Sequence, residues 1–278
     1  MRIGYLGPIG TFSEEAAVQY TKHEHIKDPV FIPFPDLLAV GDAVLEQQID
    51  IGILPVENAL DGQVNSVNDM LISTAKLCGC GEVVLPVRIH LVGKKDVTPE
   101  KCTRIYSHPQ PFGQCVQFLR TYYPLCQQFA STSTSQAVAD MLASPEPALS
   151  LSNERAATYH GATIVQYNVH DGMENETRFL AIGLAHHAPT ANDKTSICFT
   201  LPSADHPGAL YLALQPFEKA GINLTRIQSR PTKDGLGKYV FLLDMEGHCS
   251  DSMIADTLEQ LQRLTCTFRI IGSYPAWK

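Results

Sequence analysis

Short apolar runs alternate with helical stretches along the first part of the chain. The runs at residues 2–7, 30–34 and 49–54 have the length and side-chain content of buried strands. The stretch that ends at Tyr20 reads as a helix, and residues 37–48 read as an amphipathic helix. Because strands that alternate with helices form parallel sheets, we expect an α/β architecture here.

The same alternation returns after residues 83–92, an apolar run without helical periodicity that we interpret as a strand crossing into a second lobe. The elements predicted for this lobe, in chain order, are strand 103–106, helix 111–122, strand 127–130, helix 135–143, strand 148–152, helix 153–160 and strand 162–167. Lobe 1 then comprises about residues 1–83 and 165–184, and lobe 2 about residues 84–164. Two crossings between the lobes predict a hinge with a cleft facing it.

A polar segment without periodicity, residues 185–194, is predicted to be a linker. The elements expected beyond it are strands near 195–201, 223–228, 238–244 and 267–272, and helices at 208–220 and 251–264. This βαββαβ order is that of the split βαβ, ferredoxin-like fold. We expect residues 195–278 to form a separate domain that dimerises through an exposed face or edge of its sheet.

The composition is that of an ordinary globular protein. With 44% hydrophobic and 18% charged residues, the chain has no apolar run near the roughly 20 residues of a membrane span. Its first seven residues lack the long apolar segment of a signal peptide, so we expect a cytoplasmic protein without a membrane partner. The net charge of −8, without a basic stripe, argues against nucleic-acid binding. An anionic substrate would have to be held by local donors.

Eight cysteines are scattered along the chain, and no pair has the CxxC spacing of metal or redox sites. The segment Cys78-Gly79-Cys80 contains the closest pair. We expect reduced, mostly packed thiols and no metal.

A glycine-rich turn, Gly7 to Gly10, joins the first strand to the first helix. Thr11 or Ser13 can cap that helix, and Glu14 and Glu15 suit its first turn. Backbone N–H groups of such a turn can bind an anion, and a small carboxylate fits better than a nucleotide because neither the dinucleotide fingerprint nor a P-loop lysine is present. The alternative is an ordinary turn with a good cap.

Three further junctions concentrate polar side chains. Glu57 and Asn58 follow the third strand, at the edge where ligands of open α/β folds bind. Ser107–Gln110 and Ser131–Ser135 would place hydroxyl and N–H groups at the starts of helices. His108 is interpreted as an orienting residue, since Pro109 restricts the backbone beside it.

The polar cluster Asn175-Glu176-Thr177-Arg178-Phe179 opens an apolar run that reads as a strand. A loop-to-strand junction of this kind is a common place for small-molecule chemistry, although a surface turn with a solvated Arg178 would have the same pattern. Its position just after the second crossing predicts that Thr177 faces the cleft, beside the turns at Thr11, Asn58 and Ser107.

Together these motifs resemble those of the prephenate dehydratases that carry a carboxyl-terminal, amino-acid-sensing ACT domain. In the first part of the chain, the matching segments are residues 7–13, 55–58 with Gly62, 107–110 with Gln114, 131–135 and 177–179. In the second part they are residues 208–211, 222–225 and 228–231. The resemblance covers almost the whole chain, and the order of the motifs makes it specific.

The resemblance implies an enzyme that converts prephenate to phenylpyruvate with loss of water and carbon dioxide, without metal or organic cofactor. It implies a catalytic unit, residues 1–184, folded like a periplasmic solute-binding protein, and an ACT domain at residues 195–278. By their places in the motifs, Thr177 is expected to be catalytic. The residues expected to bind substrate or brace the site are Thr11, Glu57, Asn58, Ser107, Gln114, Thr132 and Arg178.

The resemblance also implies feedback regulation by L-phenylalanine and assembly into a homodimer or homotetramer. The residues expected to bind this effector are Gly208, Ala209, Leu210, Asn223 and Leu224. Two positions depart from the usual pattern: Gln228 stands where a glutamate is common, and Ala59 where a serine is common. The loss of a carboxylate at Gln228 puts the strength of the regulation in doubt.

Two rival functions remain open at this point. An arogenate dehydratase would perform the same chemistry on a substrate that differs by one amino group. A catalytically silent solute-binding or regulatory protein would keep the cleft and the sensor, but the presence of Thr177, Asn58, Ser107 and Gln114 argues against it.

Overall fold

The structure is a computed structural model that describes residues 1–172, 174–202, 207–235 and 237–277. Contacts between residues divide the chain into two compact units. Unit 1 comprises Met1–Val40, Ile53–Val64 and Val84–Phe179, and unit 2 comprises Gly41–Gly52, Asn65–Val83 and Leu180–Lys278. In the described part of the chain, no helix has both the length and the apolar character needed to cross a membrane.

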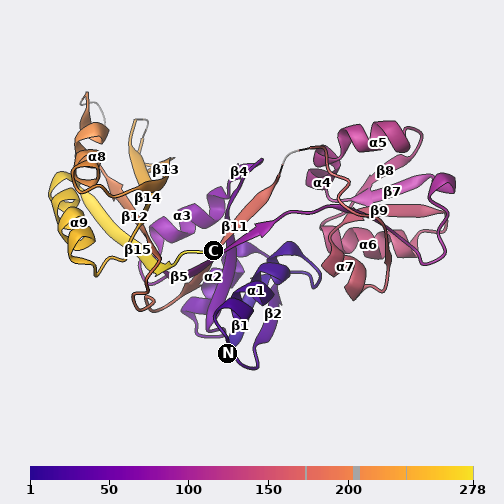
Figure 1. The fold of residues 1–278 in the computed structure, drawn as a ribbon, viewed down its shortest axis with the longest axis horizontal. Helices are drawn as coiled ribbons and strands as arrows, with labels where there is room; N and C mark the ends of the chain where they lie inside the picture. Colours follow the sequence, from indigo (N-terminus) through magenta and orange to yellow (C-terminus); the bar gives the residue numbers. More distant parts are fainter. Residues whose placement is uncertain (173, 203–206, 236, 278) are drawn as a thin grey trace. The chain divides into compact units, whose positions relative to one another are not determined.

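The amino-terminal part has the alternating strands and helices that its periodicity predicts (Figure 1). Its elements are β1 (Arg2–Leu6), α1 (Phe12–His23), β2 (Val30–Phe34), α2 (Leu37–Leu45), β3 (Ile51–Asn58), β4 (Gly62–Gln63) and α3 (Asn65–Ser73). The strands β1 and β2 pair in parallel, as expected. Of the two predicted caps of the first helix, Thr11 is the one used, because its hydroxyl accepts a hydrogen bond from the Glu14 N–H.

The strand β3 is longer than predicted. We expected it to end at Leu54, with Glu57 and Asn58 in a turn, but it continues to Asn58. The reason is a short antiparallel partner, β4, in which Gln63 pairs with Glu57 and Gly62 with Asn58. Both side chains are therefore mounted on a strand.

A second sheet has the strand order β10-β6-β9-β7-β8. Its strands are β6 (His90–Gly93), β7 (Arg104–Ser107), β8 (Gln127–Ala130), β9 (Ala148–Ser152) and β10 (Thr163–Gln166). The helical elements around it are η1 (Pro99–Lys101), α4 (Pro109–Gln114), α5 (Val116–Tyr122), α6 (Thr134–Ala143) and α7 (Glu154–Tyr159). In Figure 1, α4 and α5 lie on one face of this sheet and α6 and α7 on the other.

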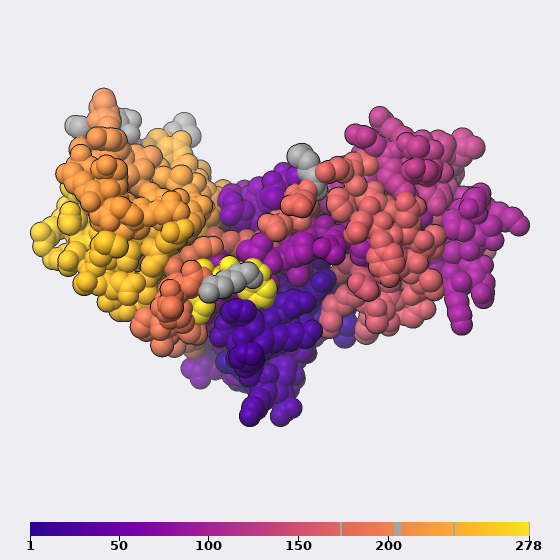
Figure 2. Space-filling view, viewed as in Figure 1, coloured from indigo at the N-terminus to yellow at the C-terminus, as the bar shows by residue number. Residues whose placement is uncertain are grey.

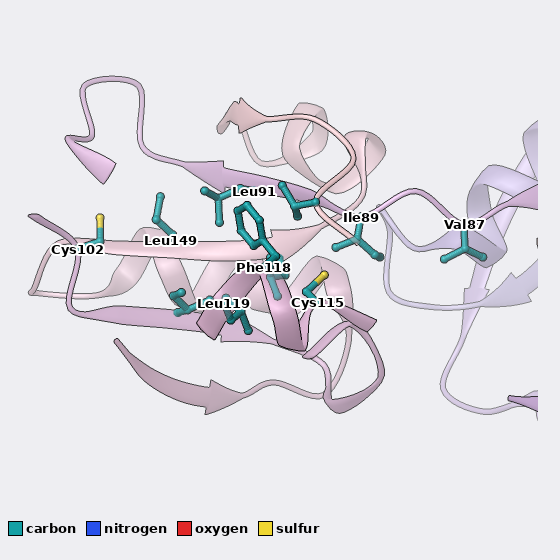
Figure 3. Close-up of a cluster of buried hydrophobic side chains, with 11 residues drawn as sticks. Val87, Ile89, Leu91, Cys102, Cys115, Phe118, Leu119 and Leu149 are labelled. Carbon is teal, nitrogen blue, oxygen red and sulfur yellow. The ribbon is translucent and has the colours of Figure 1, made fainter. Parts of the chain in front are cut away.

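The core of the second sheet explains these two helical layers. Phe118 and Leu119 of α5 pack with Leu91 and Leu149 of the strands on one face (Figure 3). Val138 and Met141 of α6 and Ala156 and Ala157 of α7 belong to a separate buried cluster. Such a three-layer arrangement is the expected consequence of helices that alternate with buried strands.

Two predicted elements of this region are interrupted. The apolar run predicted as one strand over residues 83–92 is two strands, β5 (Cys78–Pro86) and β6, separated by a connection. The helix predicted over residues 111–122 is divided into α4 and α5, because Cys115 has the non-helical backbone angle φ −123°.

The two chain connections that lead into and out of the second sheet run side by side. The Val87 N–H donates to the Asn175 carbonyl at 2.7 Å, and the Val169 N–H donates to the Ile89 carbonyl at 2.9 Å. The paired segments are residues 87–89 and residues 169–175, whereas the return was expected near residue 165.

The carboxyl-terminal part of unit 2 has the predicted βαββαβ order. Its elements are β12 (Asp193–Thr200), α8 (Ala209–Lys219), β13 (Leu224–Pro231), β14 (Tyr239–Glu246), α9 (Ser252–Leu264) and β15 (Thr267–Pro275). The spatial order β13-β14-β12-β15 is that of the ferredoxin-like fold, which confirms the prediction. In Figure 2 this segment forms a continuous orange and yellow surface.

The strand β15 also joins β5 within unit 2. Gly272 pairs in parallel with Gly79, and a Cβ atom at Gly272 would clash with the Gly79 carbonyl group. This close backbone approach requires glycine. The strand β11 (Glu176–Gly183) starts in unit 1 and ends in unit 2, and it carries Thr177 near its start.

Candidate active site

Unit 1 contains a cavity of about 470 Å³, here called the main cavity. Most of its polar wall comes from places where a strand ends or a helix begins, which is where the sequence concentrates hydroxyl and amide groups. The described residues that line it are Leu6, Gly7, Pro8, Thr11, Phe12, Ser13, Pro35, Pro55, Asn58, Asp61, Val64, Val87, Ile89, His108, Gln110, Pro111, Gln114, Thr132, Ser133, Thr134, Asn175, Thr177 and Phe179.

The side chains of Thr177 and Asn58 meet in the wall of this cavity. The Asn58 Nδ2 donates to the Thr177 Oγ1 at 2.8 Å, and the Asn58 Oδ1 accepts from the N–H groups of Leu60 and Asp61 at 2.9 and 2.8 Å. The two accepted bonds fix the orientation of the amide. Because the Thr177 oxygen already accepts a hydrogen bond, its own O–H can donate to a ligand.

The turn before α1 uses much of its own hydrogen-bonding capacity. The Thr11 hydroxyl donates to the Leu6 carbonyl at 3.0 Å, and the Gly10 N–H, which we expected to be available to an anion, donates to Glu14 Oε2 at 2.6 Å. Arg155 donates to the other Glu14 oxygen at 2.7 Å. Glu14 thus occupies this part of the predicted anion site.

These contacts determine the charge of Glu14. Burial alone would raise its pKa, but the hydrogen bond from Arg155, the Gly10 N–H and the positive charge of Arg155 together hold the pKa below its usual value. Glu14 is therefore a buried carboxylate that fixes the turn.

His108 and Gln110 lie at the start of α4, and both line the main cavity. The His108 Nδ1 accepts from the Gln110 N–H at 3.3 Å and caps α4, while burial lowers the pKa of the imidazole. Both observations describe a neutral ring, in keeping with the orienting role expected for His108. The Gln110 Nε2 donates to Asp61 Oδ2 at 2.9 Å, which joins α4 to the turn after β3.

Five of the predicted site residues line the main cavity: Thr11, Asn58, Gln114, Thr132 and Thr177. Three others are not among its described lining residues. The Ser107 hydroxyl is fully buried and donates to the Leu151 carbonyl at 2.9 Å. Glu57 accepts from Gln63 at 2.8 Å. Arg178 is half-buried, and it lies between two lining residues of a strand whose side chains alternate between faces.

Sequence reasoning missed Asn175 as a site residue, although it lies in the polar cluster. Asn175, Thr177 and Phe179 all line the main cavity, whereas Arg178 does not. The sequence pattern that could have identified Asn175 is the alternation of side chains along an extended chain, which places residues i, i+2 and i+4 on one face. Gln110 and Asp61 were missed because their contact joins segments that are distant in the sequence.

The electrostatics of the main cavity are unusual for an anion site. Among its described lining residues, Asp61 is the only one with a permanent charge, and none is lysine or arginine. Within the described chain, no group of three or more His, Cys, Asp or Glu side chains could hold a metal ion. Among the described lining residues, the groups that can donate hydrogen bonds to an anionic group of a ligand are therefore amides, hydroxyls and backbone N–H groups.

The residues predicted to bind an effector lie in unit 2. Gly208 precedes α8 with a left-handed φ of 84°, and Ala209 and Leu210 form the first turn of that helix. The Asn223 Nδ2 donates to Glu246 Oε1 at 2.8 Å, and Leu210 and Leu224 pack against the buried cluster of this fold. Gln228 accepts a hydrogen bond from Arg226 at 2.6 Å.

Residues 3–187 match the sequence profile of prephenate dehydratase. The chain belongs to the prephenate dehydratase family. It is 35% identical to a bifunctional chorismate mutase/prephenate dehydratase of Stutzerimonas stutzeri over 275 residues, which cover 99% of this chain and 73% of that protein. The similarity to that enzyme therefore includes both the region matched by the family profile and the ferredoxin-like part that follows it.

Solved structures are similar to this chain over almost its whole length. A prephenate dehydratase from Arthrobacter aurescens in complex with L-Phe superimposes with a TM-score of 0.89 at 30% identity, covering 99% of this chain and 90% of that one. GqqA, described as a novel type of quorum quenching acylase, superimposes with a TM-score of 0.88 at 26% identity, covering 100% and 98%. The family fold therefore extends through the ferredoxin-like part.

Proposed function

We propose that this chain is a prephenate dehydratase, which converts prephenate to phenylpyruvate with loss of water and carbon dioxide. The observation that carries the proposal is the Thr177–Asn58 pair in the wall of the main cavity, on a chain of this family. The pair supplies a fixed hydroxyl donor without a neighbouring base. This arrangement suits a reaction that needs help at the leaving group and no proton abstraction.

The reaction requires little from the protein. When the ring carboxylate leaves as carbon dioxide, its bonding electron pair moves into the ring and expels the ring hydroxyl, so that the ring becomes aromatic. We assign Thr177 as the catalytic residue, whose O–H donates to the departing oxygen as negative charge develops there. Asn58 positions Thr177 through the bond that it donates.

The remaining site residues receive roles according to their contacts. Thr11, Gln114 and Thr132 are proposed to contact the substrate, since they line the main cavity. Ser107, Glu57 and Arg178 are proposed to act as positioning residues: Ser107 joins the end of β7 to β9, and Glu57 joins β3 to Gln63 of β4. Reduced kcat with unchanged KM in Ser107→Ala would support this division.

An assay of purified protein tests the proposed function directly. The protein would be offered prephenate and, separately, arogenate, and phenylpyruvate and phenylalanine would be measured. Formation of phenylpyruvate supports the proposal, and a preference for arogenate would replace it by an arogenate dehydratase. The absence of turnover of either substrate would favour a silent binding protein.

We also propose that the ferredoxin-like part is an ACT domain that binds L-phenylalanine and regulates the enzyme. Support comes from the predicted effector residues at the starts of α8 and β13, and from the Arthrobacter prephenate dehydratase of the same fold, which forms a complex with L-Phe. Added L-phenylalanine should lower the turnover of prephenate, and Asn223→Ala should weaken that response. An unchanged rate at saturating L-phenylalanine would contradict the regulatory role.

Two further properties follow from the same function. We propose a cytoplasmic enzyme, since amino-acid biosynthesis takes place in that compartment, and a homodimer or homotetramer formed through the ACT domain. A mass measurement in solution, with and without L-phenylalanine, tests the assembly; a monomer under both conditions would contradict it.

A further inference from the structure

The side chain of Asn175 is a buried amide without a partner. The residue is only 4% exposed, and neither its Nδ2 nor its Oδ1 has a hydrogen-bond partner among the described residues. Its backbone is held in place, because the Asn175 carbonyl accepts from the Val87 N–H at 2.7 Å where the two connections run side by side.

Asn175 faces two hollows at once. It lines the main cavity, and it also lines a second hollow of about 500 Å³, here called the side chamber. The described residues that line the side chamber are Leu60, Asp61, Pro109, Gln110, Gly113, Gln114, His170, Asp171 and Asn175. Asp61, Gln110, Gln114 and Asn175 line both hollows.

An unpaired buried amide lowers the stability of the free protein, since it loses its hydrogen bonds to water and gains none in return. Such groups are rare in native proteins, and a catalytic role or a partner bound from solution is among the explanations for them. The amide of Asn175, at the wall of a cavity in an enzyme family, fits the second explanation.

The other amides of the main cavity show which ones are available to a ligand. Asn58 uses Nδ2 on Thr177 and Oδ1 on two backbone N–H groups. Gln110 uses its Nε2 on Asp61. Asn58 and Gln110 each keep a second N–H on the same nitrogen, whereas the side-chain amides of Gln114 and Asn175 make no hydrogen bond to a described residue, so that both polar atoms of each amide are uncommitted. No described lysine or arginine lines the main cavity to replace them.

We infer that Asn175 is a substrate-contacting residue, whose Nδ2 donates to a carboxylate of the bound substrate beside Gln114. The inference rests on the proposed function, because it takes a dicarboxylate as the substrate. An amide is suited to this task in a cavity without a cationic side chain, since it donates to a carboxylate and adds no charge that would need a counter-ion.

The test uses three variants in the full-length protein. Asn175→Leu keeps the branched shape of the side chain but has no polar atom, and Asn175→Asp keeps the shape but replaces the donor by a carboxylate. Asn192→Leu is the matched control, because Asn192 is exposed, lies in the linker and is not a lining residue of either hollow. Turnover of prephenate and the thermal midpoint Tm are measured for each.

For Asn175→Leu we expect kcat/KM to fall about 10- to 100-fold, mainly through a higher KM, as for loss of one hydrogen bond to a charged group. Its Tm should stay the same or rise, because the variant removes unpaired buried polar atoms. Asn175→Asp should lower kcat/KM further, since its carboxylate repels an anionic substrate. Asn192→Leu should leave both quantities unchanged.

Two results would overturn the inference. One is an Asn175→Leu enzyme with wild-type kcat/KM, and the other is a fall of kcat/KM in Asn175→Leu that is accompanied by a large fall of Tm, which would assign Asn175 a structural role. A wild-type protein that does not turn over prephenate would refute the proposed function and this inference with it. An active wild type with an unaffected variant would refute the inference alone.

Discussion

The hydroxyl of Thr177 is oriented by a hydrogen bond that it accepts. Asn58 donates that bond, and two backbone N–H groups hold Asn58 in the required orientation. A donor that is already aligned needs little reorganisation when charge develops on a leaving oxygen, and this is the physical basis of the catalytic role proposed for Thr177. The proposed effect depends on the Oγ1 atom of Thr177, so it can be tested by removing that atom.

Thr177→Ala is expected to lower kcat for prephenate by about 10²-fold or more, the range typical of one acid or oxyanion donor. Thr177→Ser, which keeps a hydroxyl, should lose less than about 10-fold. Steady-state kinetics on folded variants, checked by circular dichroism, decide the point. Near-wild-type turnover in Thr177→Ala would remove Thr177 from the catalytic role.

Glu14 shows how one buried carboxylate links pH to stability. Its side chain is 7% exposed and bonds both the Gly10 N–H and Arg155, whose own side chain is 34% exposed. Because the pKa of Glu14 is lower in the folded than in the unfolded protein, its stabilising contribution is complete above the unfolded pKa, near 4.5. The contribution is lost as the pH falls through the lower, folded pKa.

Glu14→Gln should therefore reduce the free energy of unfolding at pH 7 by about 1–2 kcal/mol, a value discounted for the partial exposure of Arg155. The difference from wild type should shrink as the pH falls below about 4.5, because the wild type then loses the same contribution. Urea unfolding of both proteins at a series of pH values measures this difference in the free energy of unfolding. A difference that stayed constant down to pH 3 would show that the charge of Glu14 contributes nothing.

At the scale of elements, unit 2 contains a polar contact between α3 and β13. Asp69 of α3 accepts from Arg230 Nε at 2.9 Å and from Lys233 Nζ at 3.0 Å, and Arg230 also donates to Asn65 at 2.7 Å. The hydrogen bond from Arg230 is the main cause of the lowered pKa of Asp69. The two cations differ in exposure, since the Arg230 side chain is 18% exposed and the Lys233 side chain 73%.

This difference predicts unequal effects of two matched substitutions. Arg230→Ala should lower the free energy of unfolding by about 1–2 kcal/mol, because a partly buried pair and a second hydrogen bond are lost. Lys233→Ala should cost less than about 0.5 kcal/mol, as is usual for an exposed ion pair. Denaturant melts of both variants compare them, and equal losses would mean that burial does not determine the strength of this contact.

At the scale of the whole molecule, the charge of the chain opposes its proposed substrate. The net charge is −8, and the main cavity has no described lysine or arginine in its wall to offset it. A dianionic substrate would therefore be bound by neutral donors against a repulsive long-range field. Salt screens such a field over about 10 Å at 0.1 M ionic strength, whereas short hydrogen bonds are affected much less.

We therefore expect KM for prephenate to fall about two- to fivefold when the ionic strength rises from roughly 10 to 150 mM, with little change in kcat. Initial rates in buffers of increasing sodium chloride test this expectation, with sucrose of matched osmolality as the control. A KM that rises with salt would indicate that positive groups outside the described cavity wall dominate the binding.

Local patterns determined much of the architecture. The strands at residues 127–130 and 148–152 have the predicted bounds, and the βαββαβ order was read from the sequence, because periods of two and 3.6 residues are properties of short segments. The motifs also indicated the polar segments of the main cavity. Within them, the sequence singled out Thr177, Asn58 and Gln114, which line that cavity.

Tertiary structure alone decided the partners of these residues. Thr177 meets Asn58 across 119 residues of chain, and Glu14 meets Arg155 across 141, so no local pattern records either contact. The extension of β3 depends on its pairing with β4. Asn175 was within the recognised motif, but its lack of a partner is a property of everything packed around it. A hydrogen bond depends on distances in space, and the sequence states only distances along the chain.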